Sequence, residues 1–180
     1  MNLYRAFPYD PRAAATEKGG ALYVPSTNAG RIANPDLYHE LYLAAVPEAA
    51  IAETFGRLPV WKAEDFVHAN GNRFGLARYA IRDVRSILNL DDVETLRELQ
   101  IAKPTDIVTR NRAKTCAWAR RIFEMHRYAG TCWWSSYNAD WMIFGIWRTG
   151  ELSFEPAVEI LNPRHPAVEA AAAEIKRQIA

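Results

Sequence analysis

The sequence predicts an α+β fold in a single domain that spans residues 1–180. Short strand-like and helical segments follow one another without the regular strand–helix–strand rhythm that builds a parallel α/β sheet. Hydrophobic residues make up 49% of the chain and charged residues 24%, which is the balance of an ordinary globular protein. No internal repeat, low-complexity tract or linker divides the chain, and its length suffices for one sizeable core.

The first half of the chain contains the clearest helix signal. Short apolar stretches bounded by Pro, Gly and Asn predict strands at residues 2–7, 21–24, 40–45 and 74–83. Pro47 stands at a favourable first helical position, and the helix is expected to end at Gly56. Ile51 and Phe55 are four residues apart, so they share a buried face. Glu53 lies between them and therefore points away from that face.

The second half predicts helices at residues 91–99, with Asp91 as the cap, and at residues 110–127. Two aromatic strands follow, TCWWSS and DWMIFGIW, joined by a turn around Asn138. A C-terminal helix is expected at about 166–179. Its core-facing stripe has helical spacing and consists of Val168, Ala172, Ile175 and Ile179.

Several classes of protein are disfavoured. The net charge of +1 gives no support for binding driven by the phosphate backbone, so direct nucleic-acid binding is not expected. Cys116 and Cys132 lack the spacing of a zinc site, and no metal is expected. The N-terminus has no signal-peptide pattern and no apolar run reaches membrane-spanning length, so we expect a cytoplasmic protein. Motifs for nucleotide-binding loops, zinc proteases and serine hydrolases do not occur.

What remains is an ordered set of polar residues. Arg31 sits in a Gly-containing loop, Tyr42 in a predicted strand and Glu53 in the helix that follows. These three are eleven residues apart each time. Far downstream, Ser135 and Ser136 end an aromatic strand.

These residues carry a resemblance to the RES-domain family, which is named for an Arg, a Glu and a Ser. The resemblance extends from about residue 3 to 147, and the segment 58–109 has no counterpart. Its pieces occur in the family's order: Tyr4-Arg5, Ala29-Gly30-Arg31-Ile32, Tyr42-Leu43-Ala44, Ala50-Ile51-Ala52-Glu53 and Gly130-Thr131-Cys132-Trp133-Trp134-Ser135. The chain departs from the family at two places. In the arginine loop, Ala29-Gly30-Arg31-Ile32-Ala33 replaces the family's Gly-Gly-Arg-Trp-Asn, and before the serine Trp133 replaces a Tyr.

The resemblance implies a fold like that of ADP-ribosyltransferases of the diphtheria-toxin type, with a split β-sheet core flanked by helices. It implies NAD as the substrate, cleavage of the nicotinamide–ribose bond, and water, inorganic phosphate or a protein as the acceptor. It further implies a toxin that depletes NAD and arrests growth unless a cognate Xre-like antitoxin neutralises it.

The residue chemistry suits that reaction. Positive charge develops on the ribose as nicotinamide leaves, and Glu53 is the candidate carboxylate to stabilise it. Arg31 and Arg5 are candidates for the pyrophosphate because guanidinium matches phosphate oxygens. Tyr42 would stack on nicotinamide or hold the ribose. Ser135, or Ser136 after a one-residue slip, would bind substrate oxygens or position the glutamate.

Simpler interpretations stand beside these. Glu53 has Arg57 four residues on, so a solvated ion pair on the helix surface is an alternative to catalysis. Tyr42 could be a core aromatic and Arg31 a loop residue. At the level of function, the alternatives are a protein ADP-ribosyltransferase that shares the same site, and a non-enzymatic module that binds a protein or nucleic acid.

Overall fold

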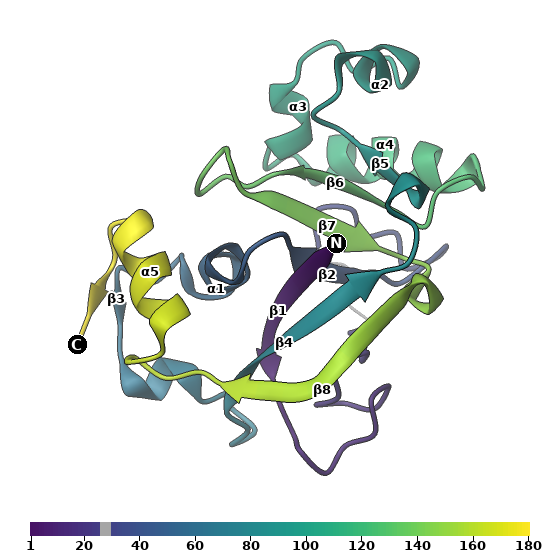
Figure 1. The fold of residues 1–180 in the computed structure, drawn as a ribbon. Coiled ribbons are helices and arrows are strands. Elements are labelled where there is room, and N and C mark those ends of the chain that lie inside the picture. Colours follow the sequence, from purple (N-terminus) through teal and green to yellow (C-terminus); the bar gives the residue numbers. More distant parts are fainter. Residues whose placement is uncertain (26–29) are drawn as a thin grey trace.

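The computed structural model describes residues 1–25 and 30–180 and confirms an α+β fold in one domain (Figure 1). Its main sheet has seven strands, mostly antiparallel, with only β5 and β6 running parallel. In spatial order they are β5 (Ile87–Asn89), β6 (Gly130–Trp134), β7 (Met142–Ile146), β2 (Leu41–Ala44), β1 (Asn2–Pro8), β4 (Phe74–Ile81) and β8 (Leu152–Ile160). A separate parallel pair consists of β3 (Val60–Trp61) and β9 (Gln178–Ile179).

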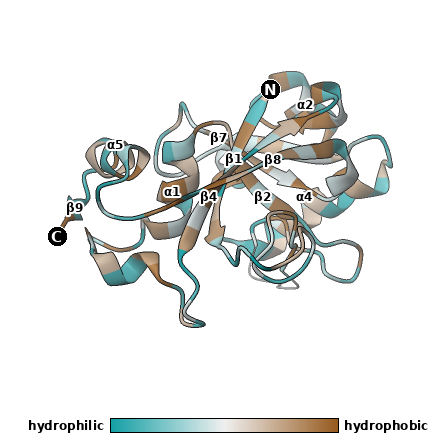
Figure 2. Ribbon diagram, turned by 60° about the horizontal axis from the view of Figure 1, so that its bottom comes forward, coloured by the Kyte–Doolittle hydropathy of each residue, from teal (hydrophilic) through white to brown (hydrophobic). Residues whose placement is uncertain are grey.

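Helices lie on the outside of the sheet (Figure 1). The α-helices are α1 (Pro47–Phe55), α2 (Val93–Glu98), α3 (Thr105–Val108), α4 (Arg112–Glu124) and α5 (Pro166–Glu174), and short 3-10 turns cover Ala63–Phe66, Val84–Ser86 and Thr149–Glu151. Hydrophobic residues colour many of the strands at the centre, whereas hydrophilic residues gather on the outer turns (Figure 2). No helix in the described part of the chain has the length and apolarity needed to cross a membrane.

The main sheet is nearly divided between β1 and β2. β1 pairs with β4 along its whole length, whereas β1 and β2 are in register only at Tyr4 and Ala44. In Figure 1 the strands β6 and β7 consequently run above β1, β4 and β8 and cross them at an angle. The gap in backbone pairing leaves room for side chains to line a cavity.

Helix α1 follows β2 directly and fixes one wall of that cavity. Pro47 stands at its first turn, as expected. Ile51 and Phe55 are buried, and α1 packs against β1 and α5. Glu53 lies on the exposed side. The orientation predicted from helical spacing is therefore confirmed.

The strand predicted at residues 21–24 is wrong, because these residues form a turn and an irregular segment. The amide of Leu22 donates to Ala15 and that of Tyr23 to Gly20, so local turn bonds replace pairing with a strand. The carbonyl of Ala21 accepts the Tyr79 hydroxyl at 2.6 Å. Ala29, which begins the arginine-loop motif, lies outside the described residues.

The C-terminal helix is shorter than predicted and ends at Glu174, not near residue 179. Lys176 has a positive φ of 54°, and the Arg177 amide donates to the Ala172 carbonyl, which turns the chain out of the helix. Ile179 then pairs in β9 and is 38% exposed, so it is not part of the helical core stripe.

Two further boundaries differ in detail. The first helix of the second half begins after Asp92, not Asp91, because the Asp92 carboxylate accepts the Thr95 amide at 2.8 Å. Asn111 caps α4, which covers 112–124 of the predicted 110–127. The two aromatic strands and the turn at Asn138 are confirmed as β6 and β7.

Candidate active site

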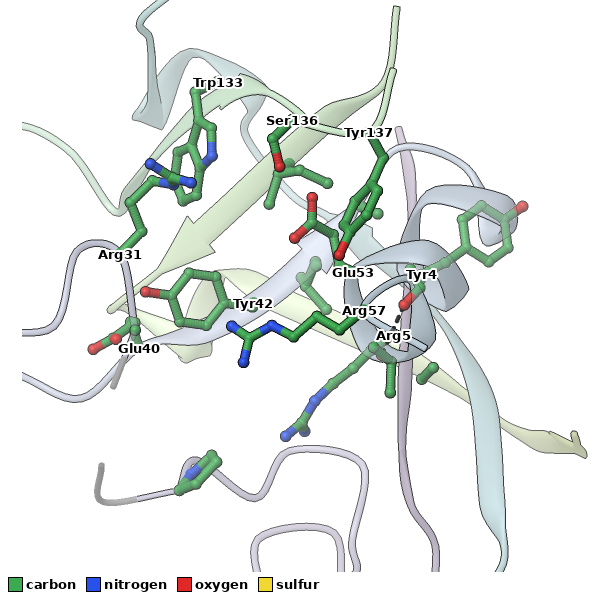
Figure 3. A pocket seen from close by; sticks show the side chains of 18 of the residues that line it. Tyr4, Arg5, Arg31, Glu40, Tyr42, Glu53, Arg57, Trp133, Ser136 and Tyr137 are labelled. Atoms are coloured by element: carbon green, nitrogen blue, oxygen red, sulfur yellow. Dashed lines mark hydrogen bonds between the residues drawn. The ribbon is translucent and has the colours of Figure 1, made fainter. Parts of the chain in front are cut away.

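A cavity of about 730 Å³ opens where the sheet is nearly divided. β1, β2 and α1 form its floor, and the end of β6 and the loop between α3 and α4 complete its walls (Figure 3). Its volume lies in the range of sites for small molecules and cofactors. The structure brings Arg5, Arg31, Tyr42 and Glu53 into its lining, and Ser135 contacts Glu53 from behind.

The best-defined contact in the site joins Glu53 to Ser135. The buried Ser135 hydroxyl donates to Glu53 Oε1 at 2.6 Å and accepts the Tyr137 amide at 3.1 Å. Ser136 is exposed and lines the cavity. Of the two serines, Ser135 therefore holds the carboxylate, whereas Ser136 faces the space in front of it.

The environment of Glu53 raises the pKa of its carboxyl group. The main cause is the partial loss of water around the carboxylate, which stays exposed only to the cavity side of α1. The hydrogen bond from Ser135 and the positive charges of Arg31 and Arg57 oppose the rise. No ion pair joins Glu53 to Arg57 among the described residues, so the simple surface ion pair is not formed. The carboxylate faces the cavity.

Tyr42 is fixed by contacts on both sides of its ring. Its hydroxyl accepts the Ile32 amide at 3.0 Å and lies beside the buried carboxyl group of Glu40. Its ring meets Trp133 edge to face, with centroids 6.2 Å apart. Burial raises the pKa of Tyr42 well above its usual value, so the hydroxyl stays neutral. Tyr42 is held rigidly while part of it lines the cavity (Figure 3).

Gly30 is required by this packing. A Cβ atom at this position would lie 2.5 Å from Glu40 Oε1 and still closer to the Tyr42 hydroxyl oxygen. Only glycine lets the arginine loop approach β2 so closely. Gly30, beside Arg31, thus allows the arginine loop to pack against Tyr42.

Arg31 joins two walls of the cavity. Its Nη1 donates to the carbonyls of Thr109 at 2.7 Å and Ile107 at 3.2 Å, 78 and 76 residues away. Burial and the nearby charge of Arg112 lower its pKa, and Glu53 opposes this effect. Arg31 therefore lines the cavity and also holds the α3–α4 loop.

Arg5 lies at the far end of the same lining. Its Nη1 donates to the carbonyls of Ala21 at 3.1 Å and Tyr23 at 3.0 Å, and its guanidinium lies 5.1 Å from the centre of the Phe7 ring. Burial is the main cause that lowers its pKa. Arg5 anchors the segment for which the sequence predicted a strand.

Sequence reasoning missed several lining residues. Glu40 is two residues from Tyr42, and the two-residue period of a strand could have placed both on one face. Arg57 was considered only as a surface partner of Glu53. The others reach the cavity only through tertiary structure: Arg110, Arg112 and Tyr137.

The described residues contain no cluster of three His, Cys, Asp or Glu side chains that could hold a metal ion. Both cysteines are free thiols; Cys132 is buried and Cys116 half-buried. The functional groups that line the cavity are the serine-held carboxylate of Glu53, the carboxyl group of Glu40, aromatic rings and a set of guanidinium groups.

The fold and this cavity define an α+β protein whose site combines carboxyl groups with several guanidinium groups. The profile of the RES domain matches residues 2–177, and the chain therefore belongs to the RES-domain family. The match also spans segment 58–109, which contains β4 and β5 of the main sheet.

Comparison with solved structures agrees on the fold. A chain of the Mycobacterium tuberculosis MbcT–MbcA toxin–antitoxin complex superposes with a TM-score of 0.60 at 17% identity, covering 98% of this chain and 88% of the other. At that identity the likeness concerns the fold alone. A search of curated proteins gave no match.

Proposed function

We propose that this protein is the toxin of a toxin–antitoxin pair and that it cleaves the nicotinamide–ribose bond of NAD. One observation carries the proposal: Glu53, held by Ser135 at 2.6 Å, faces a cavity that five arginines also line. This combination matches a substrate with a diphosphate at one end and a developing cation at the other. Membership in the RES-domain family and the likeness to a chain of a toxin–antitoxin complex support the biological role.

In the proposed reaction the bond between ribose C1′ and the nicotinamide nitrogen breaks, and its electron pair leaves with neutral nicotinamide. An acceptor oxygen then bonds to C1′ and releases its proton to solvent or to Glu53. The Glu53 carboxylate stabilises the positive charge that builds on the ribose. Ser135 fixes the direction of that carboxylate before the substrate arrives, which avoids reorganisation during the reaction.

Tyr42, Arg31 and Arg5 supply the binding surface in this proposal. The ring of Tyr42, immobilised by Trp133, offers a face for the nicotinamide ring or an edge for the ribose. Arg31 and Arg5 are each anchored through Nη1 and retain other N–H groups for phosphate oxygens. NAD is the substrate, and the scheme uses no metal.

The near-division of the sheet supports an ADP-ribosyltransferase-like architecture. The cavity opens where β1 and β2 pair at one position, between the two parts of the sheet. Water or inorganic phosphate fits the acceptor role in a cavity of this size, and a protein acceptor would use the same site.

The test is nicotinamide release from NAD by purified protein, with and without phosphate. Glu53→Gln should abolish release, while Glu48→Gln, on the same helix but outside the cavity lining, should retain it. Loss of release on omission of phosphate would identify phosphorolysis. No nicotinamide release by the wild type would refute the proposal, and equal release by wild type and Glu53→Gln would refute the role of Glu53. A mass shift on a protein without free ADP-ribose would indicate ADP-ribosylation.

The toxin role predicts a cognate antitoxin, proposed to be Xre-like, and a cytoplasmic site of action. Expression of the chain alone should lower cellular NAD and stop growth, whereas Glu53→Gln should do neither. Co-expression with a cognate antitoxin should restore both. Normal NAD levels despite abundant folded protein would contradict the role.

A further inference from the structure

The arginines of the cavity differ in how far their guanidinium groups are already engaged. Arg5 and Arg31 each donate two hydrogen bonds to backbone carbonyls. Arg57 is exposed and lines the same cavity, yet within residues 1–25 and 30–180 its side chain makes neither a hydrogen bond nor an ion pair. In Figure 3 it extends into the space between Tyr42, Glu53 and Arg5.

The backbone around Arg57 is nevertheless held firmly. The Gly56 amide donates to Ala52 at 2.7 Å, and the Leu58 amide donates to Phe55 at 2.9 Å. The Gly56 carbonyl accepts two bonds from the Arg177 guanidinium, at 3.0 and 2.9 Å. Because the backbone is fixed, a ligand in the cavity would have to order only the Arg57 side chain, which lowers the entropic cost of binding.

The charges near Arg57 point to the class of ligand. Its positive charge reaches Glu53 and opposes the rise in that carboxyl's pKa, although the two groups are not in contact. Arg110, exposed on the α3–α4 loop, lines the cavity from another element. The positive charges of both arginines also oppose the rise in the pKa of Tyr137, which lines the same cavity. An unengaged guanidinium group whose charge acts on the carboxylate, with Arg110 in the same cavity lining, suits a ligand in which an anionic group lies one sugar ring from the carboxylate's target.

We propose that Arg57, assisted by Arg110, binds a phosphate group esterified to the 5′ oxygen of the ribose that Glu53 faces. This inference rests on the proposed function. In NAD the nicotinamide ribose carries the first phosphate at C5′, so that phosphate lies within one ribose of the bond that breaks. Arg57 follows the C-cap of α1, four residues after Glu53, and both side chains line the same cavity, so one ligand can contact both.

The role predicted for Arg57 is substrate binding rather than chemistry. The phosphate is present before and after bond cleavage, so its contact with Arg57 strengthens ground state and transition state alike. Arg57→Gln should therefore raise KM for NAD and weaken ADP-ribose binding by roughly ten- to a hundredfold, with little change in kcat. Arg57→Lys should recover part of the loss, because it keeps the charge without the fork.

The experiment is calorimetric titration of ADP-ribose into wild type, Arg57→Gln, Arg57→Lys and Arg164→Gln. Arg164 is exposed outside the cavity lining and serves as the matched control. Circular dichroism should show the same folded content in all four. Kinetics with nicotinamide riboside, which lacks the phosphate, should show no penalty in Arg57→Gln beyond that of the control.

The outcomes separate this inference from the proposed function. Wild-type binding of ADP-ribose without nicotinamide release would defeat the proposed function alone, and the titration would still decide the role of Arg57. Equal affinity in wild type and Arg57→Gln, or no binding of ADP-ribose at all, would overturn the inference. A rise in the KM for inorganic phosphate alone in Arg57→Gln would also overturn the inference. Arg57 would then bind free phosphate and not the phosphate of NAD.

Discussion

Ser135 donates a hydrogen bond of 2.6 Å to Glu53 across 82 positions of sequence. The bond ties the end of β6 to the exposed side of α1 and leaves the carboxylate facing the cavity. Burial raises the pKa of Glu53, and this bond opposes the rise. The serine therefore favours the ionised form that the proposed reaction needs.

Ser135→Ala should slow NAD cleavage by roughly ten- to a hundredfold, the value of a hydrogen bond to a charged group. It should also move the acid limb of the pH–rate profile to higher pH, because the pKa of Glu53 rises further when the bond is lost. The wild-type limb should already lie above 4.5, the ordinary pKa of a glutamate. Ser136→Ala is the comparison, and a limb displaced equally in both variants would contradict the assignment.

Glu53→Gln should stabilise the fold at neutral pH. A raised pKa means that the folded state holds its proton more tightly than the unfolded state. The stability contributed by Glu53 is therefore present below about pH 4.5 and is lost as pH rises through the folded pKa. Urea unfolding should show the variant above wild type at pH 7 and the two converging in acid. A variant less stable than wild type at pH 7 would show that the folded protein does not raise the pKa of Glu53.

Gly30→Ala should disrupt the site. The new methyl group would meet the Tyr42 hydroxyl and Glu40 Oε1, so the arginine loop must move away from β2. Overpacking of this kind costs about 1–3 kcal/mol of stability, and NAD cleavage should fall with it. Gly150→Ala is the control, because nothing lies within 4 Å of its added Cβ. Thermal unfolding and nicotinamide release measure both effects, and full activity in Gly30→Ala would show that the loop tolerates displacement.

Arg177→Ala should destabilise the protein by about 1.5–3 kcal/mol, the range for hydrogen bonds to a charged group. Arg177 donates two bonds to the Gly56 carbonyl and one to the Ile175 carbonyl, and so closes the C-terminal end of α1 with a positive charge. Denaturant unfolding against Arg164→Ala measures the loss. A difference within error between the two would mean that solvent replaces these bonds at no cost.

Local patterns were sufficient for most elements of the fold. The apolar spacing of Ile51 and Phe55 correctly placed Glu53 on the opposite side of α1, because helical periodicity is a property of adjacent residues. The aromatic strands β6 and β7 also followed from local composition. The same reasoning failed at residues 21–24, where bonds from Arg5 and Tyr79 to the Ala21 carbonyl hold an irregular segment. Those partners are remote in sequence.

The sequence by itself determined the α+β class, the RES-family pattern and the identity of Glu53 as the candidate carboxylate. Only the tertiary structure decided that Ser135, and not Ser136, holds that carboxylate, and that Arg57 enters the cavity instead of pairing with Glu53 on the surface. The physical reason is the same in both cases. Periodicity determines the direction in which a side chain leaves its own helix or strand. Its contact partner depends on how helices, strands and loops that lie tens of residues apart in the sequence pack together.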